Sequence, residues 1–237
     1  MARQAKSISL SLRALSRLLG YPDAELRRHL PALRAALHSE SAVGQTRLAE
    51  LDALIDALSA ADGLDVEAAY VELFDRGRST SLHLFEHVHG DSRERGPALI
   101  DLAQTYESAG LYLAPDELPD YLPAVLEFVS TQPPREARAF LGETAHILNA
   151  LFTTLQQRRS AYASAIGALL ELAGEQARAV NIAPDEALDD TWMEPAVFDG
   201  CSSGGQRRPT HPNSHQHSQP QPIHIVRKDA AAKGAAA

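Results

Sequence analysis

The apolar residues of this chain recur at helical spacing from close to its first residue. The first stripe consists of Ile8, Leu12, Leu15 and Leu19. Separations of three and four positions place these side chains on one face of a helix. Gly20 is placed to end that helix, and Pro22 cannot continue it.

The same period continues along most of the chain, and the composition agrees with it. Leucine and alanine supply most of the apolar residues, whereas aromatic residues are only 5% of the sequence. This balance favours helices over strands, because strands prefer β-branched and aromatic residues. No segment of residues 1–200 alternates apolar and polar residues for long enough to predict a strand, so we expect an all-α fold.

Local signals divide the first half of the pattern into separate helices. Asp23, Thr46 and Asp65 are candidate N-caps of the second, third and fourth helices. Pro31 is expected to kink or split the second helix, because it lacks the N–H that the helix needs.

The second half of the chain predicts four further helices. Asp91 and Glu94 have the spacing of a capping box ahead of the first of them, which Gly110 ends. The remaining segments are a helix at about residues 118–129, a break at residues 131–134, one long helix carrying Phe140 to Leu155, and a last helix carrying Tyr162 to Leu170. Together the helices predict a single compact domain over residues 1–200.

The composition changes at about Cys201, where Ser, Gly, Pro, Gln, Asn and His become frequent. Such a segment buries too little apolar surface to offset its ordering entropy, so residues 201–237 are predicted to be a disordered tail. Its residues His211, His215 and His217 form a weak potential metal site, but a polar tail without a ligand is the more common case. A single cysteine excludes an internal disulfide framework and fits a reducing compartment.

The net charge of −9 argues against a nucleic-acid partner, because phosphate binding needs a clustered basic face. The first 20 residues carry four basic side chains among the apolar ones and have no signal-peptide pattern. No apolar run approaches the length of a membrane span. We therefore expect a soluble, non-secreted protein that is not inserted into a membrane.

Two polar stretches between the predicted helices carry the candidate functional residues. The first lies around the glycines Gly77 and Gly90, which suggest sharp turns on either side of a short helix. In the second, Pro119 is expected to fix the entry of the next helix, with Glu117 and Asp120 at its N-terminus. The first stretch is either a binding surface or a salt-bridged connection, and the second is either a ligand-facing loop or a capped helix start; composition does not choose between these.

His83, Glu86 and His87 match the H-x-x-E-H pattern of some zinc peptidases, with the two histidines one turn apart. A catalytic zinc needs a third protein ligand, and Glu107, Glu117 and His146 are equally placed to supply it. The alternative is that the two histidines form hydrogen bonds with neighbouring acids and backbone. The sequence shows no phosphate-binding loop, dinucleotide fingerprint or nucleophile elbow.

At these stretches the sequence resembles the NarJ-type nitrate reductase molybdenum-cofactor assembly chaperones, within the TorD-like redox-enzyme maturation proteins. The resemblance covers about residues 8–198. It is carried by LLGYPD (residues 18–23), YVELFDRGRSTSLHLFEHVHGDSRERG (70–96), DELPDYLPAVLEFVS (116–130) and the closing WMEP (192–195). The long run from Phe74 to Arg93 is specific to the nitrate reductase branch.

The resemblance implies an all-helical cytoplasmic chaperone without cofactor, metal or catalysis. Its partner would be the apo catalytic, molybdenum-binding subunit of nitrate reductase, bound partly through that subunit's N-terminal segment and released once the molybdenum cofactor is inserted. Chaperones of other molybdoenzymes are the nearest alternative, and a zinc hydrolase is a more distant one. The residues assigned to partner binding are Tyr70, Leu73, Phe74, Asp75, Arg76, Arg78, His83, Leu84, Phe85, Glu86, His87, His89, Glu117, Pro119, Asp120 and Tyr121.

A helical scaffold suits this role, because an apolar groove between helices accepts an amphipathic helix. Phe74, Leu84 and Phe85 are expected to line such a groove. The charged residues Arg76 and Glu86, with their neighbours in the same stretch, are expected to fix the register of the bound segment.

Overall fold

The computed structural model describes residues 7–90, 92–115, 117–178 and 180. These residues form helices and contain no strand, which confirms the all-α prediction; one isolated antiparallel bridge joins His83 to Tyr121. All of them belong to one unit, Met1–Leu188. The predicted boundary at residue 200, the tail over 201–237 and the WMEP element at 192–195 lie outside the described residues.

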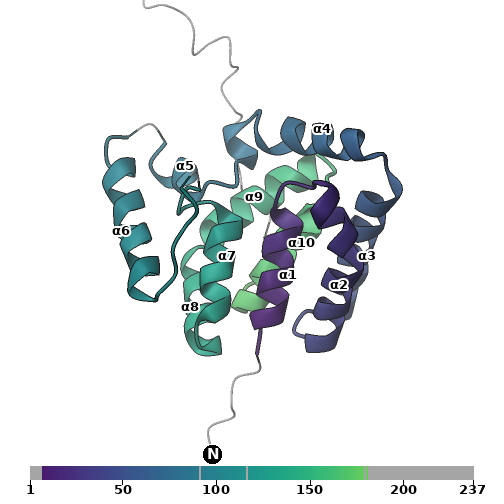
Figure 1. Ribbon diagram of the computed structural model, residues 1–237, viewed down its shortest axis with the longest axis horizontal. Coiled ribbons are helices and arrows are strands. Elements are labelled where there is room, and N and C mark those ends of the chain that lie inside the picture. The colour runs from purple at the N-terminus through teal and green to yellow at the C-terminus, as the bar shows by residue number, and fades with distance from the viewer. Residues whose placement is uncertain (1–6, 91, 116, 179, 181–237) are drawn as a thin grey trace, which may run out of the picture. The chain divides into compact units, whose positions relative to one another are not determined.

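Ten α-helices and one short 3₁₀-helix follow one another in the described part of the chain (Figure 1). They are α1 (Ser9–Leu19), α2 (Ala24–Glu40), α3 (Gln45–Ala60), α4 (Gly63–Phe74), η1 (Arg78–Thr80), α5 (Leu84–Val88), α6 (Arg95–Ser108), α7 (Leu122–Thr131), α8 (Pro134–Glu143), α9 (Ala145–Gln157) and α10 (Ala163–Ala173).

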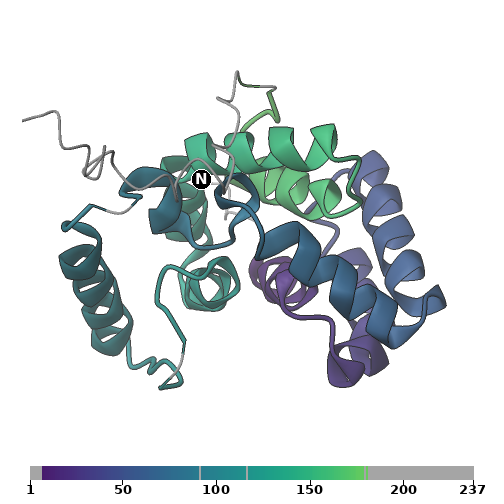
Figure 2. The same ribbon diagram turned by 90° about the horizontal axis from the view of Figure 1, so that it is seen from above.

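Helix α10 forms the centre of the core. Nine of its eleven residues are buried, because its sequence is apolar or small on every side. It packs against α9, α8, α3 and α1, and α1 in turn packs against α7 and α2. Figures 1 and 2 show α1 and α7 side by side, with α9 and α10 behind them. The predicted stripe on α1 is confirmed, since Ile8, Leu12, Leu15 and Leu19 are all buried.

One of the three predicted helix caps is confirmed. The Asp23 carboxylate accepts a hydrogen bond from the Leu26 N–H at 2.7 Å, as predicted. The predicted caps Thr46 and Asp65 are wrong. Helix α3 begins after Gly44, and α4 begins after Asp62, whose carboxylate accepts from the Leu64 N–H at 3.0 Å.

Two predicted interruptions also differ from the structure. Helix α2 runs through Pro31 without a break, because Leu30 and Leu37 are both buried from the same helix and this burial offsets one missing hydrogen bond. The long helix predicted through Leu155 is instead split at Thr144 into α8 and α9. The Thr144 hydroxyl donates to the Leu141 carbonyl at 3.1 Å and so competes with the helical backbone bonds.

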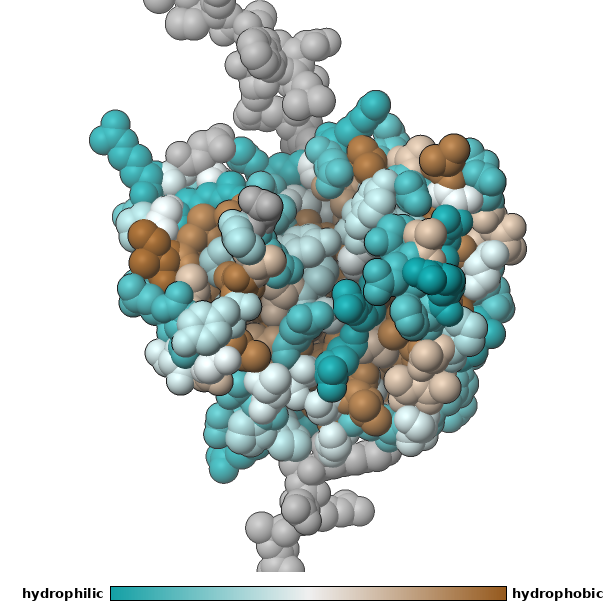
Figure 3. Space-filling model, viewed as in Figure 1, coloured by the Kyte–Doolittle hydropathy of each residue, from teal (hydrophilic) through white to brown (hydrophobic). Residues whose placement is uncertain are grey.

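Helix α6 is attached to the other helices mainly through Tyr106, its one fully buried residue. The Tyr106 ring lies 4.7 Å from the ring of Phe128 in α7, and its hydroxyl donates to the Pro119 carbonyl at 2.8 Å. Gly110, at φ +79°, ends the helical region as predicted. Figure 3 shows apolar atoms at the surface over α6, and Ile100 of this helix is 59% exposed.

Replacement of Tyr106 by phenylalanine is expected to lower the free energy of unfolding by about 1 kcal/mol, because the Pro119 carbonyl loses its donor. Urea denaturation measures this change. Tyr112→Phe is the matched control, since Tyr112 is 81% exposed, and it should change the free energy by less than about 0.5 kcal/mol. Equal effects of the two substitutions would show that the buried hydroxyl does not hold α6.

Among the described residues, every helix is too short or too polar to cross a bilayer.

Candidate functional site

Asp120 organises the polar region between α4 and α7. Its side chain is completely buried. The carboxylate accepts a hydrogen bond from the Phe85 N–H at 3.1 Å and lies 3.3 Å from Nδ1 of His83. The Leu84 N–H donates to the Asp120 carbonyl at 3.0 Å, so one residue holds the first turn of α5 through both side chain and backbone.

This position corrects the predicted role of the second polar stretch. Helix α7 begins at Leu122, and Pro123, not Pro119, occupies its first turn. Asp120 therefore caps the neighbouring helix α5 and not the helix that follows it in the chain. Pro119 is buried ahead of α7, and Glu117 is half-buried beside it.

The Arg95 cation lies between the buried carboxylate and that of Glu86. The Arg95 guanidinium lies 3.2 Å from Glu86 and 3.8 Å from Asp120. Burial alone raises the pKa of Asp120, but the hydrogen bonds from His83 and Phe85 and the positive charge of Arg95 hold that pKa below its ordinary value of 3.8. Asp120 is therefore a charged structural residue at neutral pH.

The three residues of the H-x-x-E-H pattern point to different partners. His83 contacts Asp120, Glu86 pairs with Arg95, and Nε2 of His87 lies 2.8 Å from the Ser81 carbonyl. His83 also precedes α5 instead of lying within it. No group of three His, Cys, Asp or Glu side chains gathers around one point in the described part of the chain. The geometry thus gives no support to the zinc-site hypothesis and agrees with its hydrogen-bonding alternative.

The polar region is joined to α4 by buried contacts. The Thr80 hydroxyl donates to the carbonyl of Leu73 in the last turn of α4. Tyr70 of α4 donates to the Leu19 carbonyl at 2.7 Å, and its hydroxyl lies 3.2 Å from that of Tyr121. These bonds fix the side of α4 that faces α3, because Tyr70 and Leu73 lie on that side.

A groove of about 520 Å³ lies between α3, α4 and the turn into α10; we call it the α3–α4 groove. Small, exposed residues form part of its walls, among them Ala57, Ala61 and Ala69. The charged residues Asp65, Glu72 and Arg158 also line it. The larger apolar and aromatic residues that line it are Leu54, Leu58, Val66, Tyr70, Leu73 and Tyr162. A groove of this volume with an apolar lining suits apolar side chains of a ligand.

Tyr162 has a property that the other groove residues lack. It is 8% exposed, its ring packs 5.1 Å from that of Phe74, and its buried hydroxyl has no hydrogen-bond partner among the described residues. Burial raises the pKa of this tyrosine, so the hydroxyl stays protonated at neutral pH. A buried polar group without a partner is costly, which marks it as a group that a ligand can satisfy.

The structure separates the predicted binding residues into four groups. Tyr70 and Leu73 line the groove. Phe74 and Leu84, predicted to line a groove, lie instead in the core at 4% exposure, and Phe85 is half-buried. The polar residues of α5 and Asp120 hold the local structure.

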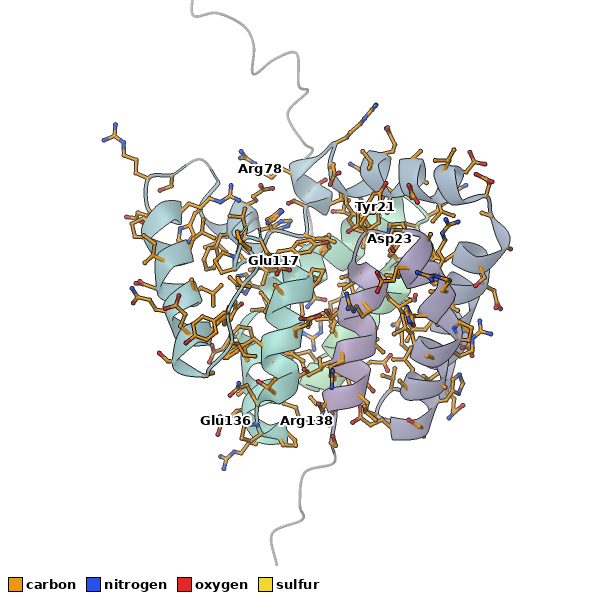
Figure 4. The ribbon with its side chains drawn as sticks, viewed as in Figure 1. Tyr21, Asp23, Arg78, Glu117, Glu136 and Arg138 are labelled. Atoms are coloured by element: carbon orange, nitrogen blue, oxygen red, sulfur yellow. The ribbon has the colours of Figure 1, made fainter. Side chains whose placement is uncertain are left out.

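The remaining predicted residues are more exposed. Asp75 and Arg76 are exposed at the end of α4, where Arg76 pairs with Glu72 at 2.9 Å. The Arg78 guanidinium lies against the turn at Gly90, which has φ +53°, and the His89 ring contacts Phe85 at 5.4 Å. In the view of Figure 4, Arg78 and Glu117 lie toward one end of the helices, and Glu136 and Arg138 lie toward the other.

Sequence reasoning missed Ala57, Ala61, Ala69 and Tyr162, which form much of the groove. Ala57 and Ala61 are one helical turn apart, next to a leucine stripe, but alanines at that spacing are too frequent in this chain to signal a groove. Arg95 was also missed as a partner of Asp120, because 25 residues separate the two in sequence and only the fold brings them together.

Comparisons with known proteins agree with this architecture. The family model described as nitrate reductase delta subunit matches residues 22–167. The chain is 44% identical over 185 residues to the nitrate reductase molybdenum cofactor assembly chaperone NarJ of Escherichia coli K12, covering 77% of this chain and 78% of that protein. It is 33% identical over 164 residues to a probable chaperone of the same name from Bacillus subtilis, covering 68% and 86%.

A solved structure shares the fold. The crystal structure of a putative redox enzyme maturation protein from Archaeoglobus fulgidus superposes with a TM-score of 0.51 at 19% identity, covering 74% of this chain and 99% of that one. The helical architecture and the family match agree with each other, and they confirm the resemblance drawn from residues 18–23, 70–96 and 116–130. The chain therefore belongs to the nitrate reductase delta subunit family, as a relative of the NarJ-type assembly chaperones.

Proposed function

We propose that this protein is a cytoplasmic assembly chaperone without catalytic activity. It binds the apo catalytic subunit of nitrate reductase and keeps that subunit competent for insertion of the molybdenum cofactor. The names of its relatives support this role. The observation that carries the proposal is the apolar α3–α4 groove, which the family-specific residues hold in shape without contributing a metal site or a catalytic group.

The groove accounts for how a client segment is held. Its lining offers leucine and tyrosine side chains between small alanines, which suits an amphipathic helix that inserts apolar residues at a spacing of three or four. We assign the N-terminal segment of the catalytic subunit to this groove. Asp120, Glu86 and Arg95 act as positioning residues, because they fix α5 and, through the contact of Tyr121 with Tyr70, the adjoining wall.

A binding experiment with the purified chain tests the role. Isothermal titration with the complete apo catalytic subunit is expected to give a defined 1:1 complex. Removal of the subunit's N-terminal segment should weaken the complex at least 10-fold, and the cofactor-loaded subunit should not bind. Equal binding of apo and loaded subunits would overturn the proposal, and tighter binding to the catalytic subunit of another molybdoenzyme would reassign the client.

Tyr162→Phe separates binding from stability. Removing a buried hydroxyl that has no partner should leave the free energy of unfolding unchanged or raise it by up to about 1 kcal/mol. The same change should weaken binding of the N-terminal peptide by roughly 5-fold, because the bound segment loses one hydrogen bond. Thermal denaturation and peptide titration measure the two effects. A destabilised variant would show that the hydroxyl is already satisfied without a client.

A further inference from the structure

A second groove, of about 690 Å³, lies between α1, α2 and the C-terminal part of α7; we call it the α1–α7 groove. Its apolar lining includes Ala14, Leu33, Ala36 and Leu111. Leu10 also lines it and is 48% exposed, which is unusual for a leucine on a helix that otherwise buries its apolar face. None of these residues belongs to the α3–α4 groove or to the polar region around Asp120.

Two arginines of α1 give this groove a positive charge along one side. Arg13 and Arg17 are exposed, lie one helical turn apart and both line the groove. Neither guanidinium makes an ion pair or hydrogen bond with any residue that the structure describes. By contrast, Arg34, Arg47 and Arg95 are all paired with carboxylates.

The other polar groups of the groove do not neutralise this charge. The hydroxyls of Ser9, Ser130 and Thr131 each donate to a backbone carbonyl. The one lining carboxylate, Glu127, is exposed on α7 and pairs with neither arginine. Donors for an anion are therefore concentrated along the α1 side. On the face drawn in Figure 3, over α1, α2 and α7, strongly hydrophilic side chains run beside apolar ones.

We propose that the α1–α7 groove docks an acidic amphipathic helix of a partner protein. Carboxylates one turn apart on that helix pair with Arg13 and Arg17, since residues four apart have the same spacing on both helices. Apolar side chains of the same helix cover Leu10 and Leu33. The two guanidiniums restrict where an acidic helix binds, because the chain carries a net charge of −9 and repels acidic segments elsewhere on its surface.

A protein helix fits these observations better than an anionic membrane does. The apolar residues lie in a groove, which a flat lipid surface cannot fill. Two arginines are also fewer than polybasic membrane anchors use. The inference is independent of the client proposed above, because it concerns different residues and an acidic ligand.

The test uses the full chain and a synthetic helical peptide of alanine, leucine and glutamate. Its glutamates stand four residues apart on one side, with leucines on the adjacent side. Titration followed by NMR should shift the amide signals of α1, α2 and the end of α7. Arg13→Glu combined with Arg17→Glu should weaken binding at least 10-fold, and Arg13→Lys with Arg17→Lys should retain most of it. A peptide with lysine in place of glutamate should not bind.

Arg28→Glu combined with Arg135→Glu is the matched control, because it changes the net charge equally at exposed arginines outside the groove. This variant should bind the acidic peptide as the unmodified chain does. Equal weakening of peptide binding in both double variants would show that binding depends on the net charge alone, and it would overturn the proposal. Three other results would also overturn it: shifts confined to the α3–α4 groove, binding to phosphatidylglycerol vesicles that depends on Arg13 and Arg17, or a dimer of this chain that the Arg13 and Arg17 reversal dissociates.

Discussion

Replacement of Asp120 by alanine is expected to lower the free energy of unfolding by about 3–5 kcal/mol. The substitution leaves the Phe85 N–H without an acceptor, and it removes the charge that faces His83 and Arg95. Helix α5 has only five residues and depends on this cap, so its loss releases the whole polar region. Urea denaturation followed by circular dichroism measures the change.

Two further variants show whether the charge or the cap causes the effect. Asp120→Asn keeps an acceptor for the Phe85 N–H but loses the charge, so a smaller loss is expected. Asp101→Ala changes an exposed aspartate of α6 and should cost less than about 0.5 kcal/mol. If Asp120→Ala cost no more than Asp101→Ala, Asp120 would not organise the site.

The same carboxylate should contribute a pH dependence to stability. Because the pKa of Asp120 is lower in the folded protein than its ordinary value of 3.8, its contribution is present above that value. The contribution is lost as the pH falls through the lower, folded-state value. The unmodified chain should therefore lose stability more steeply below about pH 4 than Asp120→Asn does.

Ala69→Glu is expected to weaken binding of the client's N-terminal peptide by about 100-fold, because a charge would be enclosed against apolar side chains. Ala69 is exposed in the free protein and lines the α3–α4 groove, so the substitution should leave the fold intact. Isothermal titration with the peptide measures the change in affinity, and thermal denaturation verifies the fold.

Ala68→Glu is a close control for this variant. Ala68 is the preceding residue of the same helix and is also exposed, but it does not line the groove. It should bind the peptide with an affinity within about 2-fold of the unmodified chain. Equal losses in the two variants would indicate a general effect of charge on α4 and would exclude the α3–α4 groove as the binding site.

The helical class and the first helix could be predicted from the sequence because they depend on local patterns. The stripe from Ile8 to Leu19 predicts a buried face, and Asp23 predicts a helix start, since both signals act within one or two turns. The position of α7 could not be predicted in this way. Pro119 and Pro123 both suit the first turn of a helix. Only the fold shows that α7 begins at Leu122, because Asp120 binds the Phe85 N–H of α5 and does not cap α7.

The burial of individual apolar residues could not be predicted either, because it depends on how segments distant in sequence pack together. Phe74, Leu84 and Phe85 have similar hydrophobicity, so composition treats them alike, yet two lie in the core and one is half-buried. The arrangement of α3 beside α4 and the start of α10 creates the groove, and no single segment encodes it. Arg13 and Arg17 of α1 stand out in the sequence only as basic side chains among apolar ones.

The central position of α10 has a consequence during synthesis. This helix is the last in the described part of the chain, yet α1, α3, α8 and α9 all pack against it. A growing chain that has not yet released residues 163–173 from the ribosome leaves the apolar faces of those helices without their common neighbour. The domain can therefore close only after nearly all of it has been translated, and until then the nascent chain itself exposes the kind of surface that holding chaperones recognise.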